Sequence, residues 1–205
     1  MEIVNDIPSL VKKVVDAFFL HNKDMPFTVA ISGIDASGKG YITKLLQNYL
    51  ENKGYKVANI NIDPWQNPIP VRLKKENAAE NVYSAIFRWN DFFEQLIFPL
   101  QKNKGIYLDT KGIHTHSDEY YSLVYDYKNM DIILIEGILL FKKQFISYYD
   151  YKIWIDCSFE TGLGRAIQRN VEKPDEEKPV HITILFTTPH IDCILKEINQ
   201  KKKQT

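Results

Sequence analysis

The chain has no excess of charge of either sign. Its 205 residues include 26 Lys and Arg and 26 Asp and Glu, so the formal net charge at neutral pH is zero. No overall field therefore draws the protein to nucleic acid or to a membrane surface, and we expect neither as a partner. The only run of like charge is three lysines at residues 201–203, which are typical of a solvated chain end.

Long apolar segments and cysteine-rich patterns are also missing. The longest apolar stretches, residues 132–135 and 138–141, are far too short to cross a bilayer. The first ten residues lack the basic-then-apolar order of a signal peptide. Cys157 and Cys193 have no metal-ligand spacing, so we expect reduced thiols in a cytoplasmic protein. A chain of this length fits a single domain over residues 1–205.

Residues 27–40, FTVAISGIDASGKG, contain a phosphate-binding pattern. A strand-like apolar run ends at Gly33, four residues follow, and Gly38 and Lys39 complete the G-x-x-x-x-G-K part of the P-loop motif. Apolar residues at helical spacing then continue to Gly54, so a strand precedes the loop and a helix follows it. The expected nucleotide-binding residues are Gly33, Asp35, Ala36, Ser37, Gly38, Lys39, Gly40 and Tyr41.

The motif has one defect. Position 40 is Gly, where a Ser or Thr hydroxyl normally ligates the Mg²⁺ that bridges the β- and γ-phosphates of ATP. The pattern therefore predicts nucleotide binding and leaves turnover open.

The remaining pattern predicts an α/β fold, a P-loop NTPase-type parallel sheet flanked by helices. A helix is expected over residues 5–21 and strands over 56–62, 132–136 and 152–156. One long aromatic helix is expected over residues 78–102. Residues 66–76 are expected to form a loop, and residues 105–130 are expected to be irregular.

Three acidic residues stand at the ends of predicted strands. Ligands of parallel α/β sheets lie at the carboxyl ends of the strands, where Asp63, Glu136 and Asp156 are expected. A carboxylate beside bound phosphates can hold Mg²⁺ or accept a proton from an attacking hydroxyl. We take Asp63 and Glu136 as candidates for these roles and Asp156 as a turn residue.

Two arginines and a charged segment follow the last strand. Arg165 and Arg169 are spaced i, i+4 and share a helix face, which suits contacts to a transferring phosphoryl group or a solvated face. Residues 171–180 suit a short lid. His114 and His116 would share one strand face, but no third metal ligand follows them. Aromatic residues of the 78–102 helix fit core packing or stacking on a substrate base.

These segments resemble the uridine kinase-like branch of P-loop nucleoside kinases. The likeness spans roughly residues 5–170 and is carried by AISGIDASGK, NID, ILIEGILLF and YYDYKIWIDCSFETGLGRAIQRN. It implies an ATP- and Mg²⁺-dependent kinase acting on a nucleoside such as uridine or cytidine. Thymidylate kinases carry a similar loop, but their Asp-Arg-Tyr signature is absent here.

The resemblance also assigns residue roles. It implies that Asp63 is the general base and binds the sugar hydroxyl, that Glu136 lies near the metal, and that Arg165 and Arg169 contact phosphates. Residues 66–130 would form the acceptor-site region, with Tyr83 and Arg88 as substrate contacts, and Lys39 would act in catalysis at the phosphates.

Two departures from that family keep a second hypothesis open. Gly40 lacks the metal-ligating hydroxyl, and the segment after residue 170 has no obvious equivalent of the family's last strand. A kinase fold that binds nucleotide without turnover, as a sensor or partner-binding protein, fits both departures. A non-nucleoside acceptor and a homo-oligomeric state also stay open.

Overall fold

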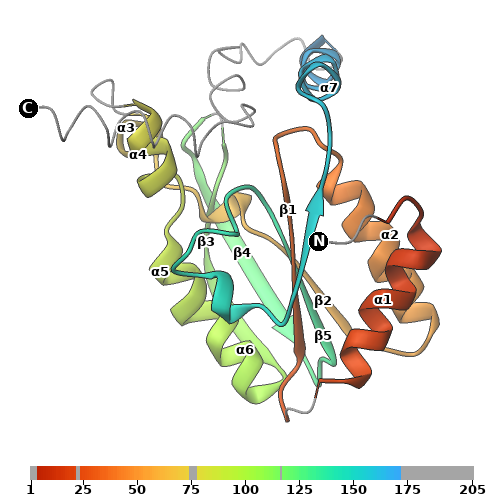
Figure 1. Cartoon of the computed structure of the whole chain (residues 1–205). Helices are drawn as coiled ribbons and strands as arrows, with labels where there is room; N and C mark the ends of the chain where they lie inside the picture. Colours follow the sequence, from red (N-terminus) through yellow and green to blue (C-terminus); the bar gives the residue numbers. More distant parts are fainter. Residues whose placement is uncertain (1–3, 22–23, 74–77, 116, 172–205) are drawn as a thin grey trace, which may run out of the picture.

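The computed structural model describes residues 4–21, 24–73, 78–115 and 117–171 (Figure 1). A four-stranded parallel sheet lies at its centre, in the order β2-β5-β1-β6. The strands are β1 (Phe27–Gly33), β2 (Val57–Asn61), β5 (Ile132–Glu136) and β6 (Tyr151–Ile155). The predicted parallel sheet is therefore confirmed.

The central strands are apolar because both of their faces are covered. Every residue of β1 is buried, as are the first four residues of β5. On one face lie α1 (Ile7–Phe19) and α2 (Lys39–Asn52), which pack side by side (Figure 1). The side chain of Asp6 caps α1 by accepting a hydrogen bond from the Ser9 N–H.

The other face carries an aromatic core. It is covered by α5 (Trp89–Asp91), a π-helical turn η2 (Phe92–Ile97) and α6 (Phe98–Asn103), which follow one another along the chain. The remaining helices are η1 (Asp63–Trp65), α3 (Ile69–Arg72), α4 (Ala78–Ala85), η3 (Ile146–Tyr148) and α7 (Phe159–Val171). None of the helices in the described part of the chain is both long and apolar enough to span a bilayer.

The prediction of one continuous helix over residues 78–102 is wrong. The helix is interrupted between α4 and α5, where residues 86–88 run beside the segment that follows β2. Ile86 accepts a hydrogen bond from the Asn67 N–H at 2.8 Å, and the Arg88 N–H donates to the Trp65 carbonyl at 2.8 Å. These bonds take the place of helical ones, so tertiary pairing overrides the local helical pattern. Residues 69–72, expected as loop, form the short helix α3.

The prediction that residues 105–130 are irregular is also wrong. β3 (Ile106–Ile113) and β4 (Tyr120–Tyr127) form an antiparallel hairpin. Its inner residues, among them Leu108, Leu123 and Tyr125, pack against the aromatic core, while the intervening residues are exposed. Tyr107, Tyr120 and Val124 lie on the exposed face, and these apolar outer residues blur the period-2 alternation in the sequence.

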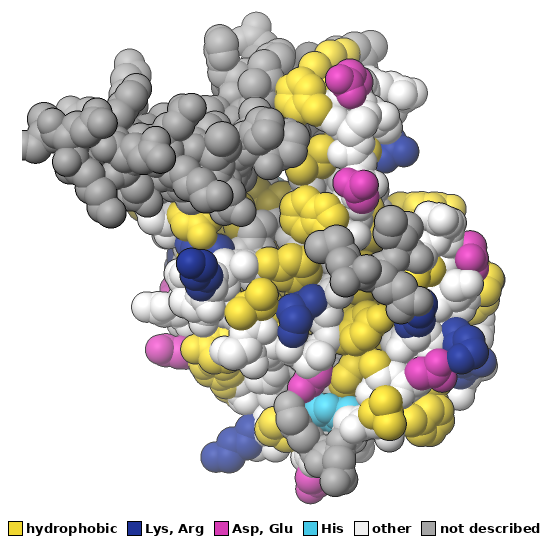
Figure 2. All heavy atoms as spheres, viewed as in Figure 1, with side chains coloured by type: hydrophobic (Ala, Val, Ile, Leu, Met, Phe, Trp, Pro, Cys, Tyr) yellow, Lys and Arg dark blue, Asp and Glu magenta, His cyan; other side chains and the backbone are white. Residues whose placement is uncertain are grey.

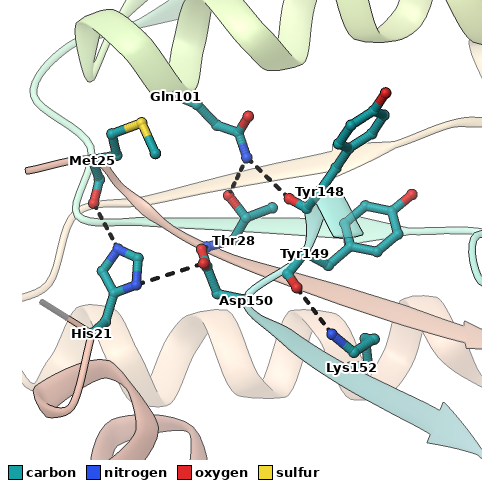
Figure 3. Close-up of polar contacts among 8 residues, drawn as sticks. All are labelled: His21, Met25, Thr28, Gln101, Tyr148, Tyr149, Asp150 and Lys152. Atoms are coloured by element: carbon teal, nitrogen blue, oxygen red, sulfur yellow. Dashed lines mark hydrogen bonds and ion pairs between the residues drawn. The ribbon is translucent and has the colours of Figure 1, made fainter. Parts of the chain in front are cut away.

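A polar cluster fixes the starts of β1 and β6 at the end of the sheet opposite the loop that follows β1 (Figures 1 and 3). The Asp150 carboxylate accepts a hydrogen bond from the Thr28 N–H at 2.9 Å and lies 3.7 Å from Nδ1 of His21. Gln101 donates to the Thr28 hydroxyl at 2.8 Å. The cluster therefore ties α6 and the edge strand β6 to β1.

Charged side chains of both signs are scattered over the face shown in Figure 2. Apolar side chains lie between them, and no large region of one charge is visible on this face. This arrangement agrees with the balanced composition.

Candidate functional site

The loop between β1 and α2 has the backbone of an anion-binding nest. Ala36 has φ 53° and Gly38 has φ 95°, so two left-handed residues lie within three positions of the loop, as in the turns that form anion-binding nests. The Ala36 N–H is held by the Asp35 carboxylate at 2.8 Å. Helix α2 begins at Lys39 and adds its positive N-terminus to the same place.

Gly33 lies where the end of β1 approaches Ile155 and Ser37 too closely for a side chain. A β carbon at this position would lie 2.7 Å from the carbonyl oxygen of Ile155 and 2.8 Å from Oγ of Ser37. Both distances are shorter than real β-carbon contacts, so only Gly lets β1, the loop and the end of β6 pack together.

Lys39 lies over the loop. Its side chain is 9% exposed, and Nζ donates a hydrogen bond to the Ile34 carbonyl at 2.7 Å. The ammonium is therefore held beside the N–H groups that would face phosphate. The side chain of Tyr41, by contrast, is 70% exposed.

Asp63 and Glu136 are brought together at the carboxyl ends of the neighbouring strands β2 and β5. Asn61 joins them, since its Nδ2 donates to Oε1 of Glu136 at 2.8 Å and its Oδ1 accepts from the Asp63 N–H at 2.7 Å. Asn61 belongs to the NID segment of the resemblance, but nothing in the sequence pattern predicts a role for it. Its register opposite Glu136 could be found only once the strands were paired.

The Glu136 carboxyl lies in an unfavourable position for a lone negative charge. Burial and the neighbouring charge of Asp63 raise the pKa of Glu136, and the ammonium of Lys39 opposes both effects. Glu136 also faces Gly40, because a β carbon at residue 40 would lie 3.5 Å from each of its carboxylate oxygens. The defect of the motif is therefore in direct contact with one of the two acidic residues.

Arg165 reaches the loop from α7. Its Nη1 lies 3.3 Å from the Ser37 carbonyl oxygen and 3.5 Å from that of Ala36. Helix α7 is close enough that a β carbon at Gly162 would lie 3.2 Å from the Asp35 carbonyl. The side chain of Arg169 and residues 172–180 of the expected lid lie outside the described residues.

The expected substrate contacts Tyr83 and Arg88 are partly engaged within the protein. The Arg88 guanidinium lies 5.1 Å from the centre of the Trp65 ring and donates to the Lys111 carbonyl at 2.7 Å. Tyr83 is half-buried, and Nζ of Lys142 lies 4.5 Å from its ring centre. Arg88 thus borders the segment that follows Asp63, whereas the contacts of Tyr83 are with Lys142.

Sequence reasoning missed Arg72, which is almost completely buried near Asp63. It donates to the Thr115 carbonyl and lies 3.9 Å from the Asp118 carboxylate. Burial lowers the pKa of Arg72, and the charges of Asp118 and Asp63 oppose that effect. An Arg in a predicted loop gave no signal of burial, because the hairpin that receives it was itself not predicted.

Buried polar atoms without a hydrogen-bond partner occur on both sides of this site. Within the described part of the chain they include Ser37 Oγ in the loop and, around the segment after Asp63, Gln66 Oε1, Arg72 Nε and Arg88 Nε. Such atoms are rare in folded proteins, and a bound ligand or water would satisfy them.

Only one residue of the histidine pair lies in the described part of the chain. His114 follows β3 directly and lies beside the Tyr121 ring, with ring centres 4.5 Å apart, whereas His116 lies outside the described residues. Among the residues that the structure describes, no group of three or more His, Cys, Asp or Glu side chains could hold a metal ion. A cation at Asp63 and Glu136 would therefore need ligands from nucleotide or water as well.

No protein-family model matches the chain, and no curated protein sequence matches it. Solved structures do. A possible uridine kinase from Bacillus stearothermophilus is 19% identical, with a TM-score of 0.65 over 83% of this chain and 91% of the other. A candidate fructose transport system kinase from Silicibacter sp. TM1040 is 14% identical, with a TM-score of 0.73 over 93% and 95% of the two chains.

A third similar structure is D-glycerate 3-kinase from Cryptococcus neoformans. It is 12% identical to this chain, with a TM-score of 0.61 over 90% of this chain and 85% of the other. At these identities the likeness shows the fold. The chain thus has the fold of P-loop kinases, and its expected resemblance to uridine kinases is confirmed at that level.

Proposed function

We propose that the protein is an ATP-dependent kinase that transfers the γ-phosphoryl group to a hydroxyl of a small molecule. The observation that carries this proposal is the Asn61-linked pair of Asp63 and Glu136 beside the anion-binding loop. A module that only binds phosphate needs the loop, whereas phosphoryl transfer also needs carboxylates at the phosphate end.

The loop and two cations would hold the phosphates. N–H groups of residues 33–41 and the ammonium of Lys39 would bind the β- and γ-phosphates. Arg165, already against the Ser37 carbonyl, would turn toward the charge that develops on the transferring group. Arg169 is proposed for the same role from the resemblance alone.

Asp63 would orient the acceptor hydroxyl and take its proton. It lies at the end of β2, on the side toward Arg72 and the 63–67 segment, where an acceptor would reach the γ-phosphate. Catalysis of this kind rests mainly on positioning and electrostatics.

The residues fit a magnesium ion. Glu136 and Asp63 supply oxygen ligands, and their mutual repulsion is the environment that a divalent cation relieves. When bound, Mg²⁺ would bridge phosphate oxygens and neutralise their charge. Glu136 and Asp63 are the residues proposed to hold it.

For the acceptor we propose a nucleoside of the uridine or cytidine kind. Support comes from the sequence resemblance, which also suggests Tyr83, and from the position of Arg88 beside the segment after Asp63. A non-nucleoside alcohol is the alternative acceptor, since Gln66 Oε1 and the Nε atoms of Arg72 and Arg88, which have no hydrogen-bond partner within the described residues, would suit any molecule with several polar groups.

A second function is favoured by Gly40. Without a hydroxyl at residue 40, the fold could bind nucleotide and serve as a sensor without turnover. Substitution of Asp63 separates the two functions, because only the kinase requires this carboxylate for its activity.

The test is ATP consumption with Mg²⁺ in the presence of pooled hydroxyl compounds, with products identified by mass spectrometry. A species with the mass of one acceptor plus a phosphoryl group is expected, and it would name the acceptor. Stabilisation by ATP with no product from any pool would favour the non-catalytic binder.

A further inference from the structure

Lys142, in the loop that follows β5, is a buried cation to which the described residues supply no carboxylate. Its side chain is 5% exposed, and burial lowers its pKa without a nearby acid to oppose the effect. The equally buried Arg72 differs, because Asp118 lies 3.9 Å from its guanidinium and Asp63 also acts on it. A buried charge normally has a partner of opposite sign, so Lys142 has room for a negatively charged ligand.

The hydrogen bonds of the ammonium leave donors over. Nζ donates to the Tyr83 carbonyl at 2.8 Å, in the last turn of α4, where a cation stabilises the carbonyl end of a helix. This bond uses one of its three N–H groups. The other contacts of Nζ are with the rings of Tyr83, Trp89 and Phe145, whose centres lie at 4.5, 5.3 and 5.7 Å. Ring faces attract a cation but are weak hydrogen-bond acceptors.

Trp89 adds a second buried donor to the same cluster. Its side chain is 6% exposed, and its indole Nε1 has no hydrogen-bond partner within the described part of the chain. The ring packs on Phe145, with centres 4.6 Å apart, and lies against Lys142. An indole N–H can only donate, so an acceptor is required to satisfy it. The cluster therefore combines positive charge with N–H donors, which is the chemistry of an anion site.

The cluster lies on the acceptor side of the candidate site. Trp89 follows Arg88, whose N–H donates to the Trp65 carbonyl at 2.8 Å and so joins this segment to the one after β2. Tyr83, whose ring lies beside Nζ of Lys142, is half-buried, so the cluster borders on solvent at this ring. A small molecule could therefore reach the cluster without entering the aromatic core.

We propose that Lys142 and Trp89 form a binding site for the acid group, a carboxylate or a phosphate, of a small molecule. The ammonium and the indole N–H would both donate hydrogen bonds to its oxygens. The acid group belongs either to the acceptor, which would favour the non-nucleoside alternative, or to a separate effector. The site goes beyond the proposed function, and only the acceptor case rests on that function.

The first test follows the indole N–H signals in ¹⁵N-edited NMR spectra of the unsubstituted protein, with acetate and inorganic phosphate as probes. We expect a saturable shift of the Trp89 signal, which is assigned with Trp89→Phe. The Trp65 signal is the internal control and should not move, because its Nε1 already donates to the Tyr125 hydroxyl at 2.9 Å. No saturable Trp89 shift at tens of millimolar of either probe would overturn the proposal, including the case of an anion bound only at the loop after β1.

Lys142→Met supplies the second arm. It should weaken anion binding at Trp89 at least about tenfold, because hydrogen bonds from a charged donor are the stronger ones. Lys143→Met, at the exposed neighbouring lysine, is the matched control and should bind as the unsubstituted protein does. Equal affinities of the two variants would overturn the proposal. The titration of the unsubstituted protein stays decisive if Lys142→Met does not fold.

The source of the acid group is found from ATP consumption with Mg²⁺, using hydroxy acids and their uncharged methyl esters as acceptors. Phosphorylation of an acid but not of its ester, reduced at least about tenfold in Lys142→Met, would assign the group to the acceptor. Phosphorylation of uncharged acceptors, together with the Trp89 shift, would assign it to a separate effector. No phosphorylation of any acceptor would overturn the kinase proposal alone, since the Trp89 titration decides this inference independently.

Discussion

Single residues set the shape of the phosphate loop through contacts that allow no extra atom. Gly33 brings the loop within contact of both Ser37 and Ile155, and Gly38 supplies a left-handed residue at the start of α2. Lys39 then folds back over the loop to the Ile34 carbonyl. The arrangement is therefore determined by side-chain size as much as by charge.

Gly33→Ala should damage both the loop and the fold. The added methyl would lie 2.7 Å from the Ile155 carbonyl oxygen, and overpacking of this kind costs about 1–3 kcal/mol. Urea unfolding and calorimetric nucleotide binding measure the two effects. Gly164→Ala in α7, where a β carbon meets nothing within 4 Å, should be neutral or stabilising by about 0.5–1 kcal/mol. Equal stability of both variants would contradict the packing described for Gly33.

Glu136 gives a pH-dependent prediction at the same scale. Because its folded-state pKa is raised, the folded protein binds its proton more tightly, and stability is lost as pH rises from the ordinary carboxyl pKa through the folded value. Glu136→Gln should therefore be more stable than the unsubstituted protein at pH 7 in EDTA, with the difference vanishing toward pH 4. Thermal unfolding between pH 4 and pH 7 measures this difference in stability, with Glu94→Gln, at an exposed glutamate of η2, as the control. A Glu136→Gln variant less stable than the unsubstituted protein at pH 7 would contradict the prediction.

At the scale of helices and strands, some elements are determined by the local sequence pattern and others by tertiary contacts. β1, the loop, α2 and the buried strand β5 could be predicted because their patterns are strong and contiguous in the sequence. The break before α5 could not, because it depends on backbone pairing of residues 65–67 with 86–88. The β3–β4 hairpin was missed because apolar residues on its exposed face, Tyr107, Tyr120 and Val124, obscure the alternation of apolar and polar positions.

The same distinction holds for the candidate site. The motif predicts Lys39, the strand ends predict Asp63 and Glu136, and helix spacing together with the resemblance predicts Arg165. The structure brings these four residues to one edge of the sheet. Asn61 needed the strand register and Arg72 needed the hairpin, so neither could be found from spacing alone. Their roles, like those of the named residues, remain proposals.

Lys142 connects the loop after β5 to α4 without an acidic partner among the described residues. Its Nζ donates to the Tyr83 carbonyl at 2.8 Å and lies over the rings of Tyr83, Trp89 and Phe145. Burial lowers the pKa of Lys142 to about 8. The charged form is thus disfavoured in the folded state, and that penalty is present below pH 8 and lost as pH rises toward 10.5.

Lys142→Met removes this pH dependence. Between pH 7 and 9.5 the free energy of unfolding of the unsubstituted protein should rise by roughly 1–2 kcal/mol relative to that of the variant. The contacts of the ammonium with the aromatic rings favour its charged form and so reduce this difference. Urea unfolding at the two pH values measures it. Lys143→Met, at the exposed neighbouring lysine, should show no such change. Parallel pH profiles for Lys142→Met and the unsubstituted protein would contradict the burial effect.

At the scale of the whole molecule, the two ends of the sheet serve different purposes. The carboxyl ends of the strands carry the candidate site, and the opposite end carries the polar cluster of Asp150, Thr28 and His21 (Figure 3). Stability and ligand binding should therefore be separable by substitution at the two ends.

Asp150→Ala tests this separation. Loss of the carboxylate leaves the Thr28 N–H without its side-chain acceptor and should cost about 1–3 kcal/mol of unfolding free energy. Nucleotide affinity should stay within about twofold, since the cluster lies at the far end of β1. Asp126→Ala, at an exposed residue of β4, is the control for stability. A large loss of nucleotide affinity in folded Asp150→Ala would contradict the separation.

The central claim is that the carboxylate of Asp63 works with the loop to transfer a phosphoryl group, and one measurement tests it most directly. ATP labelled with ¹⁸O in its γ-phosphoryl group is incubated with Mg²⁺ and pooled hydroxyl acceptors, and labelled phosphate ester is quantified by mass spectrometry. We predict a labelled ester with the unsubstituted protein and with Asp109→Asn, and at least about a hundredfold less with Asp63→Asn. Equal yields from the Asp63 and Asp109 variants, or bound ATP with no labelled ester, would contradict the account.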